Sequence, residues 1–86
     1  MKKNYKILFK GEAEKEFKKL PNSFRGKVAV ILNSIAEDPF IGKKLHGEYK
    51  NYYSVRVWPY RIVYRILKKE IVVVVVKIKH RKDAYK

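Results

Sequence analysis

Five consecutive valines at residues 72–76, inside the segment EIVVVVVKIK, constrain the fold more than any other feature of the sequence. Valine is β-branched and favours strands. An unbroken apolar run of this length is typical of a strand that is covered on both faces. We therefore expect residues 70–79 to form a central strand of a sheet. Two more β-rich segments, YYSVRVW and YRIVYRIL, precede it, with turns expected at Trp58-Pro59 and Lys68-Lys69.

The first half of the chain predicts one strand and two helices. Residues 5–10 alternate as a short strand does, and residues 12–20 place apolar side chains at helical spacing until Pro21 ends the helix. Asn22 or Ser23 is expected to cap a second helix, which ends at Asp38-Pro39. The apolar stripe of this helix consists of Phe24, Val28, Ile31, Leu32 and Ile35.

These elements define the expected fold. Residues 40–51 contain two glycines and no sustained period, which predicts a loop. The order is β-α-α-β-β-β, and all 86 residues form one domain. The fold class is α+β, with a helical hairpin packed on a small, mostly antiparallel sheet.

The charge balance indicates a polyanionic partner. Lysine and arginine number 22 against 8 acidic residues, for a net charge of +14. The alternative, a thermophile's surface of ion-pair networks, needs both signs of charge in comparable numbers. Cysteine is absent, and no carboxylates cluster in the sequence, so we expect no disulfide, no metal and no cofactor. No apolar run reaches the roughly 20 residues of a membrane span, and the N-terminal apolar stretch is too short for a signal peptide. We expect a cytoplasmic protein with no membrane partner.

The segment SVRVWPYRIVYRI predicts a hairpin that carries arginines on one face. If Trp58-Pro59 is a two-residue turn, Arg56 lies opposite Arg61, and Arg65 follows on the same face. Directly opposed like charges destabilise a sheet, whereas an anion-binding site exploits them. The alternative is that Arg56 and Arg65 are solvated surface charges. Trp58 is either a turn-capping aromatic or a stacking platform.

Three stretches of this chain together resemble the RelE branch of the RelE/ParE superfamily of type II toxins. They are Leu45-His46-Gly47, the hairpin VRVWPYRIVY, and the terminal HRKDAYK. The resemblance spans nearly the whole chain. It implies a ribosome-dependent endoribonuclease that cuts mRNA in the A site by attack of a 2′-OH, and an acidic antitoxin that neutralises it.

The resemblance also implies which residues form the catalytic site. By position, Arg61, Arg81 and Tyr85 match the hairpin arginine, the C-terminal arginine and the terminal tyrosine of that family. Relatives often carry lysines where Ser54 and Arg56 stand here, so Arg56 keeps a charge role and a role that needs a deprotonated lysine is in doubt. Arginines would stabilise the phosphorane. Tyr85 would either carry a proton or stack on a base.

Further basic residues are expected to bind RNA. They are Lys43, Lys44, Lys50, Arg65, Lys77, Lys79, His80 and Lys82. The direction in which Lys77 and Lys79 point cannot be obtained from the valine-rich strand by parity. His46 is expected near RNA or solvent rather than in catalysis.

Three other functions fit parts of the same sequence. A ParE-like gyrase inhibitor would have the same fold with a protein target, and a non-catalytic nucleic-acid-binding module would need only the charge. A degenerate toxin would bind its antitoxin without cutting RNA.

Overall fold

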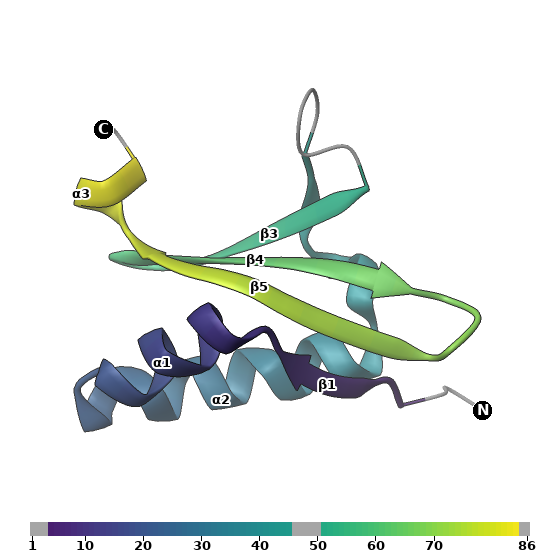
Figure 1. The fold of residues 1–86 in the computed structure, drawn as a ribbon, viewed down its shortest axis with the longest axis horizontal. Helices are drawn as coiled ribbons and strands as arrows, with labels where there is room; N and C mark the ends of the chain where they lie inside the picture. Colours follow the sequence, from purple (N-terminus) through teal and green to yellow (C-terminus); the bar gives the residue numbers. More distant parts are fainter. Residues whose placement is uncertain (1–3, 46–50, 85–86) are drawn as a thin grey trace.

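The structure, a computed structural model, describes residues 4–45 and 51–84 (Figure 1). Two α-helices follow a first strand, and four strands follow the helices. The elements are β1 (Lys6–Phe9), α1 (Gly11–Lys19), α2 (Asn22–Glu37), the 3-10 helix η1 (Pro39–Ile41), β2 (Lys43–Lys44), β3 (Tyr52–Val57), β4 (Tyr60–Leu67), β5 (Val72–His80) and α3 (Arg81–Ala84).

The strands form one mixed sheet in the order β1-β5-β4-β3-β2. Strand β5 pairs in parallel with β1 and antiparallel with β4, and the remaining pairs are antiparallel. The valine-rich strand is therefore an interior strand, as the sequence predicts. It begins at Val72 rather than at residue 70, because a four-residue turn over 68–71, with Ile71 at φ 56°, replaces the expected Lys68-Lys69 turn.

The predicted loop over residues 40–51 is wrong in part. Its first residues lie in η1 and in the short edge strand β2, and residues 46–50 lie outside the described chain. Strand β2 could not be predicted from sequence, because two residues are too few to show a periodic pattern. Its pairing with β3 depends on tertiary contacts.

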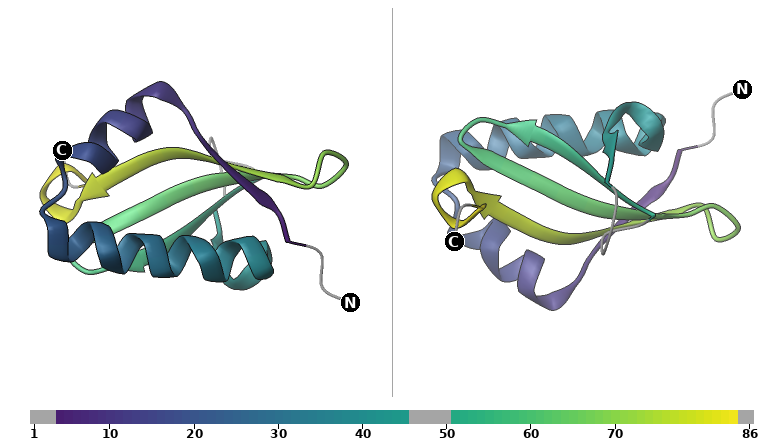
Figure 2. Two further views of the ribbon diagram at one scale, coloured as in Figure 1. Left: turned by 90° about the horizontal axis from the view of Figure 1, so that it is seen from below. Right: turned by 90° about the horizontal axis from the view of Figure 1, so that it is seen from above.

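The helices cover only one face of the sheet, as the two turned views in Figure 2 show. On that face the predicted stripe of α2 packs as expected, with Val28, Leu32 and Ile35 buried. The sheet contributes Val57, Ile62, Tyr64, Val73, Val75 and Ile78 to the same core. Helix α2 differs in one detail from the prediction, since its N-cap is Pro21 and no side chain caps it.

The other face of the sheet, called here the open face, is not covered by α1 or α2, and the single turn of α3 lies at its end (Figures 1 and 2). The valine-rich strand was expected to be covered on both faces, but α1 and α2 cover only one of them. On the open face Val72 and Val74 are half-buried and Val76 is buried.

A β-bulge sets which side chains of β5 reach the open face. Tyr64 pairs with Val75 and Val63 pairs with Lys77, so Val76 is an extra residue between them. A bulge of this kind re-aims every side chain beyond it. With the extra residue, Lys77 and Lys79 come to lie opposite Val63 and Arg61; a regular ladder would place them on the helical face.

A buried tyrosine of the central strand β4 anchors η1, and the edge strand β2 that follows η1, to the sheet. The Tyr64 hydroxyl donates a hydrogen bond of 2.7 Å to the carbonyl of Pro39. Burial raises the pKa of Tyr64 to about 12, and Gly42 donates a backbone hydrogen bond to the same hydroxyl. A Cβ at Gly42 would collide with that hydroxyl and lie 2.9 Å from the carbonyl oxygen of Ser54. Residue 42 therefore has to be glycine for η1 and β2 to approach the sheet this closely.

Candidate functional site

Three cationic side chains form a row across three strands on the open face. Arg56 of β3 lies opposite Arg61 of β4, and Arg61 lies opposite Lys79 of β5. Residues paired in this way have Cβ atoms about 4.5–5.5 Å apart and project from the same face. The predicted register of the hairpin is confirmed, and the bulge in β5 adds Lys79 to the two arginines. We call Arg56, Arg61 and Lys79 the cationic row.

A fourth cation reaches the same place from the end of β5. Arg81 is the first residue of α3, and its backbone N–H donates a 2.7 Å hydrogen bond to the carbonyl of Pro59 in the β3–β4 turn. Its guanidinium carbon lies 4.8 Å from the centre of the Trp58 ring. The last strand thus delivers Arg81 to the tip of the arginine hairpin.

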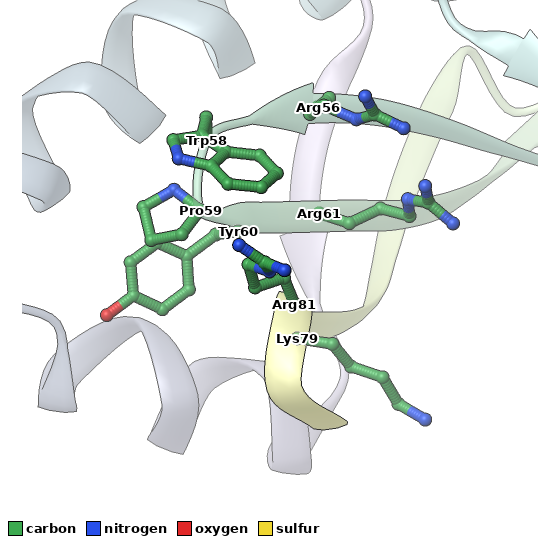
Figure 3. Close-up of a pocket in the computed structure, with 7 residues that line it drawn as sticks. All are labelled: Arg56, Trp58, Pro59, Tyr60, Arg61, Lys79 and Arg81. Atoms are coloured by element: carbon green, nitrogen blue, oxygen red, sulfur yellow. The ribbon is translucent and has the colours of Figure 1, made fainter. Parts of the chain in front are cut away.

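These side chains surround a small pocket of about 70 Å³ (Figure 3). It is lined by Arg56, Trp58, Pro59, Tyr60, Arg61, Lys79 and Arg81. Typical small-molecule pockets measure about 300–1,000 Å³, so this one suits a compact anionic group rather than a whole nucleotide. None of its lining residues is acidic, and four of them are cationic. In Figure 3 the charged ends of Arg56, Arg61 and Lys79 extend to one side, whereas the Arg81 guanidinium lies toward the Trp58 ring.

The whole-chain comparisons identify the family. A model of the "ParE toxin of type II toxin-antitoxin system, parDE" family matches residues 7–85, almost the entire chain. The chain belongs to the RelE/ParE family of type II toxins. The toxin RelG of Mycobacterium tuberculosis is 30% identical over 84 residues, which cover 95% of this toxin and 97% of RelG.

Solved structures of similar proteins have the same fold as this toxin. A chain of the toxin–antitoxin complex RelBE2 from Mycobacterium tuberculosis aligns with a TM-score of 0.82 at 29% identity, over 91% of this toxin and 92% of that chain. The isolated RelE toxin of E. coli aligns with a TM-score of 0.81 at 27% identity, over 94% and 95% of the two chains. The predicted α+β fold is therefore confirmed, and so is the resemblance to RelE.

The other predicted RNA-binding residues of the toxin lie at different distances from the pocket. Lys43 pairs with Ser54, so it shares the open face, and both line a hollow that also includes Arg56 and Arg61. Lys77 and Arg65 lie further along the open face, where Arg65 lies opposite Tyr52 with its guanidinium 5.7 Å from the ring.

The remaining predicted residues are not brought to the pocket or are not described. Lys44 pairs with Tyr53 and so lies on the opposite side of β2 from Lys43. His80 projects from the helical face, where its ring meets the edge of Tyr60 and its Nδ1 accepts a hydrogen bond from the Lys82 N–H. Lys82 itself is exposed. Tyr85, Lys50 and His46 lie outside the described residues.

Four lining residues of the pocket, Lys79, Trp58, Pro59 and Tyr60, were not identified as its components from sequence. Lys79 was expected to bind RNA only diffusely, because the bulge that turns it toward Arg61 has no sequence signature. Trp58 was weighed as a turn cap or a stacking platform, whereas its ring contacts the guanidinium of Arg81. The sequence feature that could have indicated this role is the position of Trp58 in the turn between two arginine-bearing strands.

Within 4–45 and 51–84, no three histidine, cysteine or acidic side chains come together as a metal site would need. In the same residues, no helix combines the length and the apolar character that crossing a bilayer requires.

Proposed function

We propose that the toxin is a ribosome-dependent, metal-independent endoribonuclease that cuts mRNA in the ribosomal A site. The observation that carries the proposal is that Arg56, Arg61, Lys79 and Arg81 line one small pocket that has no acidic residue in its lining. A purely structural sheet gains nothing from three directly opposed cations. A phosphodiester that becomes more negative during reaction gains from all of them.

The proposed reaction is an internal transfer at phosphorus. The 2′-oxygen of the A-site nucleotide attacks the adjacent phosphorus and loses its proton, and the bond from phosphorus to the 5′-oxygen breaks. The 5′-oxygen takes up a proton, which leaves a 2′,3′-cyclic phosphate and a 5′-hydroxyl. The phosphorane passed on the way carries about one negative charge more than the starting diester, so cations fixed around it stabilise it selectively.

Each basic side chain has a role in this proposal. Arg61 lies in the middle of the cationic row, where its planar fork can contact two phosphate oxygens, and Arg81 approaches from a second direction. Arg56 supplies charge. Relatives often carry lysines at the positions of Ser54 and Arg56, and in this toxin Lys79 supplies a lysine to the pocket instead. Following the resemblance, Tyr85 assists, either in proton transfer or by stacking on a base.

The small size of the pocket supports dependence on the ribosome. It accommodates a phosphate-sized group and offers little surface to hold the flanking nucleotides, so orientation of the attacking 2′-OH has to come from elsewhere. The ribosome holds mRNA in place and presents RNA phosphates to the toxin's net charge of +14. Lys43, Arg65 and Lys77 on the open face, with Lys44, Lys50, His80 and Lys82, would contribute to this binding. The proposal implies a cytoplasmic protein.

An acidic antitoxin is the second proposed partner. The RelBE2 structure that aligns with this toxin is a toxin–antitoxin complex. An acidic partner also complements a chain in which basic residues outnumber acidic ones by 22 to 8.

A translating-ribosome cleavage assay tests the proposed function, with mRNA ends mapped by primer extension. Wild type should produce cuts within A-site codons. Arg61→Ala and Arg81→Ala should each slow cleavage by about 10²–10³-fold, by analogy with the loss of one oxyanion-hole donor. Tyr85→Phe tests the assisting role of the tyrosine.

Arg25→Ala is a matched control for the two arginine variants. Arg25 lies on α2, where it hydrogen-bonds Asn22 on the helical side of the molecule, so its loss should leave cleavage unchanged. Intact mRNA with wild type would contradict the proposal. Inhibition of gyrase by wild type would then favour the ParE-like alternative, whose name the matching family model bears.

A further inference from the structure

Trp58 is the only tryptophan of the chain, and it stands on the two-residue turn between β3 and β4. Its side chain is 59% exposed. A ring of this size normally contributes to stability by burial, which Trp58 does only in part. Its close contact is instead with a charged group, the guanidinium of Arg81 at 4.8 Å from the ring centre (Figure 3).

Arg81 is attached to this turn in two ways. Its backbone N–H is bonded to the carbonyl of Pro59, and its guanidinium lies over the neighbouring Trp58 ring. The backbone bond places the Cα of Arg81, but it leaves a long side chain with several rotatable bonds. Among the described side chains, the Trp58 ring provides the contact that restricts where the charged end lies.

The surroundings of Arg81 would otherwise repel that charged end. Arg56, Arg61 and Lys79 line the same pocket. Among residues 4–45 and 51–82, no salt bridge joins Arg81 to a carboxylate. The face of an indole attracts a guanidinium through its quadrupole and does so without neutralising it. Trp58 therefore opposes the repulsion and keeps the full charge available to a ligand, which a carboxylate would not.

We infer that Trp58 is a positioning residue that holds the guanidinium of Arg81 at the phosphate pocket. The inference deepens the proposed nuclease function and rests on it for its kinetic consequence. Holding the side chain in place before the substrate arrives removes part of the ordering cost of binding, about 2- to 10-fold for one long side chain. Trp58 acts through Arg81 and contacts no reacting atom.

Quenching of tryptophan fluorescence by acrylamide tests the contact without any reference to activity. Because Trp58 is the sole tryptophan, the signal reports this ring alone. Arg81→Ala should uncover one face of the ring and raise the quenching constant. Arg81→Lys keeps the positive charge but lacks the planar guanidinium group. It should raise the quenching constant by a smaller amount.

Lys68→Ala is the matched control for the quenching experiment. Lys68 lies over Phe40, with 5.2 Å between its Nζ and the ring centre, so the variant removes an equivalent cation from a different aromatic ring. It should leave Trp58 quenching unchanged. Equal quenching of wild type, Arg81→Ala and Arg81→Lys would overturn the inference and leave the nuclease proposal intact.

A double-mutant cycle in the ribosome assay tests the consequence. Trp58→Ala should slow cleavage about 3- to 10-fold when Arg81 is present and have no further effect in the Arg81→Ala background. Trp58→Phe keeps an aromatic face and should restore most of the rate. Phe40→Ala, which removes a similarly exposed ring, should leave the rate unchanged.

The cycle separates positioning from direct recognition of RNA. If Trp58→Ala slowed cleavage equally in both backgrounds, the ring would act on a nucleobase or on stability, and the inference would be wrong. If wild type did not cut mRNA at all, the nuclease proposal would fail, and the quenching experiment alone would decide whether Trp58 holds Arg81.

Discussion

Replacing the central arginine of the cationic row should make the folded toxin more stable. Arg61 lies between Arg56 and Lys79, so Arg61→Gln relieves two like-charge pairs at once and keeps a long polar side chain. Two unit charges about 5–7 Å apart in water repel by roughly 0.6–0.8 kcal/mol. Splaying of the exposed side chains reduces this, so we expect a gain of about 1 kcal/mol for the two pairs together.

The same strand offers a matched control. Arg65 projects from the same face of β4, but its partners across the sheet are Tyr52 and Val74. Arg65→Gln makes the same chemical change without relieving a cation pair, and it removes the contact with the Tyr52 ring. It should therefore lower stability by about 0.5–1 kcal/mol.

Thermal unfolding in phosphate-free buffer measures both changes. For a domain of this size, 1 kcal/mol corresponds to about 4–8 °C in Tm. Arg61→Gln should raise Tm by about this amount in 10 mM salt, and the gain should shrink in 1 M salt, where the screening length falls from about 30 Å to 3 Å. If both variants shifted Tm in the same direction, or if the gain did not depend on salt, the repulsion argued for the cationic row would be refuted.

Three predictions concern the tyrosine that fastens the sheet edge. Tyr64→Phe should lower the free energy of unfolding in urea by about 1–3 kcal/mol, because the buried carbonyl of Pro39 loses its donor. Burial raises the pKa of Tyr64 to about 12 in the folded protein, so between about pH 10 and 12 the tyrosine ionises in the unfolded chain only. Wild type should therefore lose stability as the pH rises through this range, and Tyr64→Phe should lose less. Gly42→Ala should destabilise by about 1–3 kcal/mol through its collision with that hydroxyl, whereas Gly26→Ala, whose new methyl group meets nothing within 4 Å in α2, should stabilise by up to about 1 kcal/mol.

The hairpin register could be predicted from sequence because its determinants are local. A two-residue turn at Trp58-Pro59 fixes Arg56 against Arg61, and the alternation along β3 and β4 follows from it. The helices and the interior place of β5 follow in the same way from apolar period and composition. The family resemblance rests on residues of the same hairpin, on Leu45-His46-Gly47 and on the C-terminal segment.

The pairing of β4 with β5 could not be predicted in the same way. Valines occupy both faces of β5, so nothing in their pattern marks Val76 as the extra residue. That single residue decides whether Lys79 faces Arg61 or the helices. The contact of Arg81 with Trp58 depends in turn on where β5 ends, which is a tertiary outcome rather than a local one.

The position of β5 in the sheet has a consequence for how the toxin is made. Among the described residues, β1 is the first strand and lies at one end of the sheet, where it pairs with β5; β5 pairs with β4 on its other side. During synthesis the N-terminal residues therefore have no strand to pair with until residues 72–80 have emerged. Arg81 follows immediately, so the fold and the pocket become complete at nearly the same moment. A nascent chain that has not yet reached Arg81 has neither the complete sheet nor the complete pocket.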